Sequence, residues 1–192
     1  AKNKLPALAE AIEEDGPRPF TLVYCGDGSV EDDASGEEER QIELVSRLLN
    51  ENGWKSARFT SRENPSLRRE ILDSFRVQAL DAMVAIRCLD EGIDIPACRT
   101  AYILASARNP RQFIQRRGRI LRKAENKDIS EIHDFVVCLP EFDDEDLFEV
   151  EKNLLKSELQ RIAEFSQLST NPGDSYTVLE DLLARFDLEH IL

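Results

Sequence analysis

Apolar positions along this chain alternate between short continuous runs and longer stretches with helical spacing. The short runs predict five strands, over residues 20–25, 54–60, 81–86, 100–105 and 131–139. Between them, apolar residues recur at three- or four-residue spacing, which predicts helices over 5–14, 37–52, 65–75 and 109–122. Strands that alternate with helices of this length are typical of parallel βαβ units. The pattern therefore predicts an α/β fold, a parallel sheet flanked by helices.

Beyond residue 142 the pattern predicts helices without strands. Apolar residues at helical spacing indicate a long helix over 143–168 and a second helix over 176–186. Asn171-Pro-Gly173 is a break between them. We therefore divide the chain into a domain over 1–142 and a helical C-terminal extension over 143–192.

Charge and hydrophobicity narrow the class of protein. The chain of 192 residues has a formal net charge of −13, and its acid is concentrated in 31–39 and 141–151. Such a charge argues against non-specific nucleic-acid binding through net charge, although it leaves room for a local basic groove. No apolar run approaches the roughly 20 residues that span a bilayer, and the start lacks the apolar core of a signal peptide. We expect a cytoplasmic protein with no membrane partner.

The cysteines and histidines do not suggest a metal site. The four cysteines form no Cys-x-x-Cys pair, and the two histidines are isolated from one another. Cys25 and Cys138 lie in apolar strand-like runs, so we expect buried, reduced thiols there.

The arginine-rich stretch 109–122 is the strongest candidate for chemistry. Asn109 suits a helix N-cap, and the proline that follows suits the first helical position. On that helix Gln115, Arg119 and Arg122 fall within an arc of about 60°. Two guanidiniums on one face suit phosphate, which they bind in a bidentate way. A solvated basic helix is the alternative from composition alone.

Several polar residues follow the ends of predicted strands. Ligands of parallel sheets bind beyond the carboxyl ends of the strands, so these residues belong on the binding edge. Gly26, Thr60, Arg62 and Arg87 are the candidates for contact with a nucleic-acid backbone. For each of them, plain surface exposure is the alternative. The glycine-containing loop after residue 25 matches neither Gly-x-x-x-x-Gly-Lys-Ser/Thr nor Gly-x-Gly-x-x-Gly. It is expected to be an ordinary surface loop, and contact with a nucleic-acid backbone is the alternative.

Three segments of the chain resemble motifs of superfamily 2 helicases. Thr21-Leu-Val-Tyr-Cys25 is similar to motif IV, Cys88-Leu-Asp-Glu-Gly-Ile-Asp-Ile-Pro96 to motif V, and Gln115-x-x-Gly-Arg-x-x-Arg122 to motif VI. The resemblance covers residues 20–140 and is nearest to DEAD/DEAH-type helicases of restriction and defence systems. It implies a RecA-like lobe, the second of the two lobes of a motor.

The resemblance also implies roles for individual residues. ATP and Mg²⁺ would bind between this lobe and an N-terminal RecA-like lobe of the same protein, and neither would bind this lobe tightly. Arg119 and Arg122 would act as arginine fingers, because phosphoryl transfer needs positive charge where charge develops. Gln115 would hold the attacking water or bridge to the other lobe. Gly92 would let the nucleotide approach the backbone. Asp94 would accept a hydrogen bond from a ribose hydroxyl; alternatively, its carboxylate would form a turn.

The chain departs from the family pattern at one position and contains only half of a motor. Many relatives have a threonine that contacts the nucleic-acid backbone where this chain has Arg87, which could meet a phosphate instead. No Walker A lysine and no Asp-Glu-x-x box of a first lobe is present. We therefore expect this lobe alone to be inactive as an ATPase.

Two functions of different classes remain. The leading one is the second lobe of an ATP-dependent helicase or translocase; we expect DNA as its track, although the residues themselves do not separate DNA from RNA. The alternative is a non-catalytic nucleic-acid-binding or scaffold module with a RecA-like fold. The intact pair of Arg119 and Arg122 disfavours that alternative.

Overall fold

The computed structural model describes residues 4–26, 29–31, 38–86, 98–104, 118, 120–125, 127–136 and 145–191. The chain divides into two compact units, Ala1–Phe135 and Val136–Leu192. Each unit has a hydrophobic core of its own. The domain boundary predicted between residues 142 and 143 lies outside the described residues.

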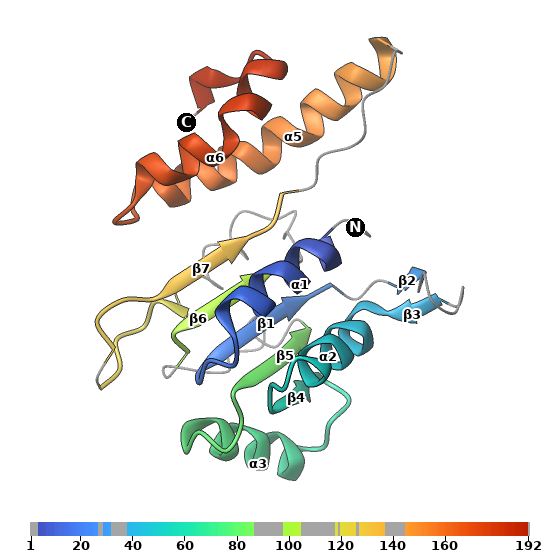
Figure 1. The fold of residues 1–192 in the computed structure, drawn as a ribbon, viewed down its shortest axis with the longest axis vertical. Helices are drawn as coiled ribbons and strands as arrows, with labels where there is room; N and C mark the ends of the chain where they lie inside the picture. The colour runs from blue at the N-terminus through green and yellow to red at the C-terminus, as the bar shows by residue number, and fades with distance from the viewer. Residues whose placement is uncertain are drawn as a thin grey trace. The chain divides into compact units, whose positions relative to one another are not determined.

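A five-stranded sheet forms the centre of the first unit (Figure 1). Its strands, in spatial order, are β4 (Ser56–Phe59), β5 (Ala82–Ile86), β1 (Thr21–Cys25), β6 (Thr100–Ile103) and β7 (Glu131–Asp134). All neighbouring strands pair in parallel. The first of these strands in the chain is therefore the middle one, and later strands are added on both sides of it, as in doubly wound folds. The predicted parallel α/β sheet is confirmed.

Three of the four helices predicted for the first unit from apolar spacing lie in the described part of the chain, and two of them have a local reason to begin or end where they do. The three helices are α1 (Lys4–Asp15), α2 (Gln41–Glu51) and α3 (Pro65–Arg76). The side chain of Asn64 caps α3 by accepting the Leu67 N–H at 2.9 Å, and Pro65 occupies the first turn, where no amide donor is needed. Gly53, with φ of 78°, turns the chain away after α2.

Each face of the sheet carries its own helices, because alternate residues of a strand point to opposite faces. On one face, the apolar residues of α1 and α2 pack against Val23, Val84 and Tyr102. On the other face, Phe75 of α3 and Ile120 belong to the core that covers the sheet. Ile120 comes from the end of the arginine-rich stretch, so its apolar side chain anchors that end to the sheet.

The segment between β1 and α2 differs from the expected plain loop. β2 (Ser29–Glu31) and β3 (Glu38–Arg40) pair antiparallel in a separate two-stranded sheet. The helix predicted from residue 37 accordingly begins at Gln41. The apolar spacing that predicts this helix starts only at Ile42, so the acidic residues before it gave no information on where the helix begins.

The described part of the second unit consists of helices, as predicted. They are α5 (Glu145–Ser166), α6 (Pro172–Arg185) and the short 3-10 helix η1 (Glu189–Ile191). Leu159, Leu183 and Phe186 are at most 1% exposed and form the centre of its core. The predicted start of the second helix at residue 176 was wrong, because Pro172 occupies the first turn of α6 instead of breaking the chain there.

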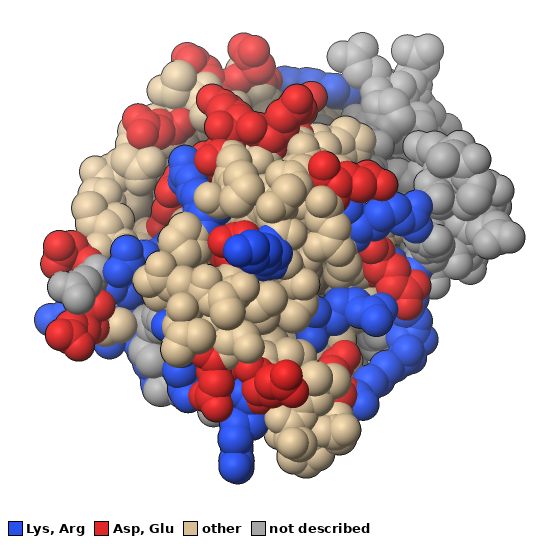
Figure 2. All heavy atoms as spheres, turned by 60° about the horizontal axis from the view of Figure 1, so that its bottom comes forward, with Lys and Arg blue, Asp and Glu red and all other residues tan. Residues whose placement is uncertain are grey.

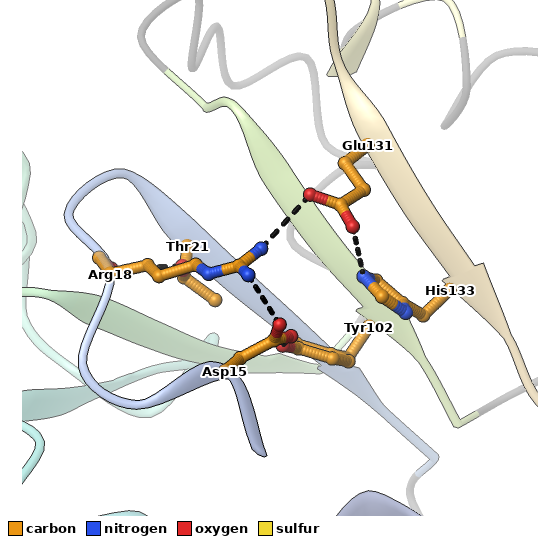
Figure 3. Close-up of polar contacts among 6 residues, drawn as sticks. All are labelled: Asp15, Arg18, Thr21, Tyr102, Glu131 and His133. Atoms are coloured by element: carbon orange, nitrogen blue, oxygen red, sulfur yellow. Dashed lines mark hydrogen bonds and ion pairs between the residues drawn. The ribbon is translucent and has the colours of Figure 1, made fainter. Parts of the chain in front are cut away.

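A polar cluster ties the end of α1 to β6 and β7 (Figure 3). Asp15, at the end of α1, accepts a hydrogen bond from the Tyr102 hydroxyl and pairs with Arg18. Arg18 Nη1 donates to Glu131 Oε2 at 3.0 Å. The Tyr102 ring stacks on the His133 ring with 4.6 Å between centroids. Burial, followed by the hydrogen bond to Asp15 and its charge, raises the pKa of Tyr102.

Candidate nucleic-acid and nucleotide edge of the sheet

The carboxyl ends of the parallel strands meet at one edge of the sheet. Gly26 directly follows β1, and the turn that contains Thr60 and Arg62 directly follows β4. Only β5 separates these two strands. Since ligands of parallel α/β sheets bind beyond this edge, three of the predicted nucleic-acid contacts lie where a ligand is expected.

The backbone amide of Gly26 is used inside the protein. Its N–H donates to Oε1 of Gln41 at 2.7 Å. Gln41 is the first residue of α2 and is only 5% exposed, so this bond ties the end of β1 to the start of α2. A phosphate contact at Gly26 would therefore use the space left by the missing side chain, and not its amide.

Thr60 is also committed to an internal contact. Its amide and its hydroxyl both donate to Glu63 Oε2, at 2.5 and 2.6 Å, and the residue is 8% exposed. The hydroxyl oxygen accepts the Arg62 N–H at 3.1 Å. A hydroxyl has a single proton to donate. The structure thus corrects the expected role of Thr60: it shapes the turn, and its donors are not available to a phosphate.

Glu63 is the residue that fixes this turn. Burial by itself would raise the pKa of Glu63, but the hydrogen bonds from the Thr60 hydroxyl and amide, together with the charge of Arg58, lower it below its ordinary value. The ionised carboxylate therefore holds the backbone from Thr60 to Glu63 in one conformation. This conformation leaves the Arg62 side chain exposed to solvent.

Arg62 is the guanidinium at this edge that remains available. No ion pair within the described part of the chain uses it. Arg58, in contrast, lies 3.7 Å from a Glu43 carboxylate oxygen, and the Arg68 guanidinium lies 5.0 Å from the centre of the Phe59 ring. Guanidinium on an exposed turn is well suited to a phosphate.

The described residues on the face shown in Figure 2 do not form one continuous basic field. On the face shown in Figure 2, lysine and arginine side chains are interspersed with carboxylates. The chain as a whole carries a formal charge of −13. Attraction to a polyanion would therefore depend on a few local guanidiniums.

The end of the arginine-rich stretch is well defined. Gly118 and Ile120 are helical, and Arg122 lies beyond the helix with an exposed side chain. Lys127 Nζ donates to two carbonyl oxygens here, that of Ile120 at 2.5 Å and that of Arg122 at 2.9 Å. The Ser130 hydroxyl donates to the Ile120 carbonyl as well, at 3.3 Å. The helix predicted to reach residue 122 therefore stops slightly earlier, in a turn closed by side-chain donors.

Two of the four cysteines lie in the described part of the chain, and both are buried free thiols. Burial raises the pKa of Cys25 far above its ordinary value. Burial also raises the pKa of Cys98 to about 12, against the opposing charge of Lys127. The prediction of a buried, reduced thiol is thus confirmed for Cys25, while Cys138 lies outside the described residues.

Several predicted site residues lie outside the described residues. They are Gln115, Arg119, Gly92, Asp94 and Arg87. Their roles as fingers, nucleotide contacts and nucleic-acid contacts stay predictions.

Sequence reasoning missed three residues that fix these turns. Gln41 and Glu63 act at the carboxyl edge, whereas Lys127 acts in the turn that leads into the start of β7. For Glu63 a signal existed, because Thr60-x-x-Glu63 has the spacing at which a threonine and a glutamate exchange hydrogen bonds near a helix start. Lys127 had a weaker signal, since basic side chains often bind the last carbonyls of a helix. Gln41 had none, because its partner is a backbone amide fifteen positions away.

The structure adds two negative findings. Among the described residues, no group of three histidine, cysteine, aspartate or glutamate side chains could hold a metal ion. None of the helices described is both long enough and apolar enough to cross a membrane.

Comparison with known families gives one match that covers more than half of the chain. The family described as "Helicase conserved C-terminal domain" matches residues 7–124. The match includes all three motif-like segments, 21–25, 88–96 and 115–122.

Individual proteins with similar sequences or structures are consistent with this family match. Dicer-like protein 2 of Phaeosphaeria nodorum is 36% identical over 77 residues, which are 40% of this chain and 5% of that protein. The DNA 3'-5' translocase XPB2 of Sulfurisphaera tokodaii is 42% identical over 60 residues, 31% of this chain and 14% of that protein. The C-terminal domain of the DEAD-box protein Dbp5 has a similar fold, with a TM-score of 0.52, 18% identity, and coverage of 81% of this chain and 78% of that one. The matches thus span only a small part of Dicer-like protein 2 and of XPB2.

Proposed function

Because the chain belongs to the family of helicase conserved C-terminal domains, we propose that it is the second RecA-like motor lobe of an ATP-dependent DNA helicase or translocase. The observation that carries this proposal is a single family match that runs through all three motif-like segments. The parallel sheet supports it, because its carboxyl edge is where ligands of such folds bind.

In this proposal the lobe supplies positive charge to the nucleotide. Arg122 lies exposed just beyond the end of its helix, which suits a side chain that must reach a phosphate on another lobe. Arg119 would act beside it, with Gln115 placing the attacking water. ATP with Mg²⁺ would supply the transferred phosphoryl group, held mainly by the N-terminal lobe. The guanidiniums would stabilise the charge that develops during transfer.

Gly92 and Asp94 complete the proposed nucleotide contacts of this lobe. Glycine lets a ligand come close to the backbone, and a carboxylate can accept hydrogen bonds from a ribose hydroxyl. Both roles follow from the similarity of 88–96 to motif V.

The proposed track is a DNA strand across the carboxyl edge of the sheet. Arg62 would bind one phosphate, Gly26 would allow a close backbone approach, and Arg87 would bind a neighbouring phosphate. Contacts of this kind give affinity without base preference. The name of the relative XPB2, a DNA translocase, supports DNA over RNA.

The test compares this chain with the longer protein that contains it. Steady-state phosphate release is measured with and without single-stranded DNA or RNA of the same sequence. We expect DNA-stimulated hydrolysis from the longer protein and none from this chain alone, because most phosphate contacts belong to the other lobe. A longer protein that hydrolyses no ATP, or robust hydrolysis by this chain alone, would contradict the proposal.

A further inference from the structure

The turn that carries Arg122 is closed by a lysine from outside the three motif-like segments. Lys127 Nζ donates to the carbonyl oxygens of Ile120 and Arg122, at 2.5 and 2.9 Å. The last carbonyls of a helix have no partner within the helix, and a cation placed there satisfies them and interacts well with the helix dipole. One ammonium thus binds two carbonyls of the chain that carries Arg122.

Three further contacts fix the same turn. The side chain of Ile120 is 1% exposed and belongs to the core against the sheet. The Ser130 hydroxyl donates to the Ile120 carbonyl at 3.3 Å. The Lys127 amide donates to the Ala124 carbonyl at 3.2 Å, which closes a short antiparallel bridge. The turn therefore has an apolar anchor at its start and the lysine at its end.

The position of the two bound carbonyls matters for the direction of the Arg122 side chain. The Ile120 carbonyl and the Arg122 carbonyl lie on either side of the Arg122 Cα along the chain. Holding both limits the rotation of the backbone between them, and so limits where the exposed guanidinium of Arg122 can reach. A displacement of about 1 Å in a catalytic group can cost about 10²-fold in rate.

We infer that Lys127 is a positioning residue for Arg122, which it aims at the nucleotide phosphate by holding the carbonyls of Ile120 and Arg122. The inference rests on the proposed function, because Arg122 meets a phosphate only in the assembled motor. In this role Lys127 acts on the backbone, because two of its three donors bind the carbonyls of Ile120 and Arg122.

The surroundings of Lys127 support the view that its ammonium serves to hold the backbone. Burial lowers the pKa of Lys127, and the charge of Arg99 lowers it further, while Cys98 acts in the opposite direction. Burying an ammonium costs free energy unless hydrogen-bond acceptors of the protein replace the water around it. The two carbonyls are such acceptors.

The first experiment measures ATP hydrolysis by the longer protein at saturating ATP and DNA. Lys127→Met keeps the length of the side chain and removes its donors, and we expect kcat to fall by about 10-fold to 10²-fold with the KM for ATP within about threefold. Lys123→Met is the matched control: it removes the same charge from an exposed side chain of the same turn and should leave kcat unchanged.

A double-mutant cycle distinguishes positioning from a general loss of structure. If Lys127 acts through Arg122, Lys127→Met should add no further loss to Arg122→Ala. Lys127→Arg should recover part of kcat, because a guanidinium can also donate to two carbonyls. Ser130→Ala, which removes only one donor to the Ile120 carbonyl, should lower kcat less than Lys127→Met does.

The second experiment needs no activity and uses this chain by itself. Amide hydrogen exchange over residues 120–125 should be faster in Lys127→Met than in the wild type, and unchanged in Lys123→Met. Exchange in β1 and β5 reports whether the fold is kept.

The outcomes separate the two proposals. A wild-type kcat in Lys127→Met, or losses that multiply in the double mutant, would overturn the positioning role, as would unchanged exchange over residues 120–125. A longer wild-type protein without nucleic-acid-stimulated hydrolysis would overturn the proposed function, and the positioning role with it.

Discussion

Two neighbouring residues at the carboxyl edge should respond in opposite ways to substitution. The Thr60 hydroxyl donates to Glu63 inside the turn, whereas the Arg62 side chain is exposed. We predict that Thr60→Val lowers stability and leaves the contact with nucleic acid unchanged. Arg62→Ala should do the reverse.

The magnitude for Thr60→Val follows from its contacts. The change keeps the shape of the side chain but removes a hydroxyl 2.6 Å from a carboxylate oxygen and an acceptor for the Arg62 amide. A hydrogen bond to a charged group contributes about 1.5–3 kcal/mol, and because Glu63 is partly open to water we expect the free energy of unfolding to fall by about 1–2 kcal/mol. With a urea m-value of about 2 kcal/mol/M, the midpoint should fall by about 0.5–1 M.

Urea unfolding of the first unit can be followed through Trp54. It is the only tryptophan of the chain, is 2% exposed, and lies in the core under α1 and α2. Arg62→Ala changes an exposed side chain and should alter the free energy of unfolding by less than about 0.5 kcal/mol.

Binding to a labelled single-stranded DNA is measured by anisotropy at several salt concentrations. Loss of one phosphate contact should reduce the slope of log K against log salt by about 0.7 in Arg62→Ala. Thr60→Val should keep the wild-type slope. A lower slope in Thr60→Val together with unchanged stability would refute the assignment, because the hydroxyl would then bind phosphate rather than Glu63.

The pH dependence gives a second check on the same contact. The pKa of Glu63 is lowered in the folded protein, so its ionised form adds stability above the unfolded pKa of about 4.3, and this stability is lost as pH falls through the lower folded pKa. The Thr60→Val deficit should therefore shrink below about pH 4. A deficit that stays constant to lower pH would show that the carboxylate is not the partner.

Two other predictions concern the finger and the polar cluster. Arg122→Ala in the longer protein should lower kcat by about 10³-fold or more, with little change in the KM for ATP. Arg122→Lys should recover little of this loss, because an ammonium lacks the planar, bidentate donor geometry of a guanidinium. Wild-type phosphate release by Arg122→Ala at saturating ATP and DNA would contradict this prediction. Tyr102→Phe should cost about 1–2 kcal/mol by urea unfolding, because it removes the donor to Asp15 and keeps the ring. Since the pKa of Tyr102 is raised on folding, this contribution is present below about pH 10 and is lost as pH rises further, so the deficit should shrink there. A wild-type free energy of unfolding in Tyr102→Phe would count against the cluster.

The sequence was informative wherever burial produces a pattern. β1 and β5 are buried along almost their whole length, so they read as continuous apolar runs. α3 was predictable to within a residue because Asn64 and Pro65 mark its start. β2 and β3 are three residues each and rich in charge, so no apolar spacing indicated them.

For the candidate site, the sequence predicted where residues lie in the fold better than it predicted their hydrogen-bond partners. A strand end predicts that the next residue lies at the carboxyl edge of the sheet, and Gly26 and the Thr60 turn do lie there. It does not predict that a donor is already used, because that depends on a partner such as Gln41, brought near by the fold. Arg62 differs from these residues, because its long side chain is exposed to solvent and no ion pair in the described part of the chain uses it.

The edge therefore divides its polar groups into two kinds. Gly26 with Gln41, and Thr60 with Glu63, fix the backbone through internal hydrogen bonds. Arg62 remains for an external anion. In a chain with a formal charge of −13, such isolated guanidiniums must overcome a repulsive background, so the affinity of this lobe for DNA should be weak and sensitive to salt. Weak contacts fit the proposed motor, because a lobe that moves along a track has to release one phosphate before it binds the next.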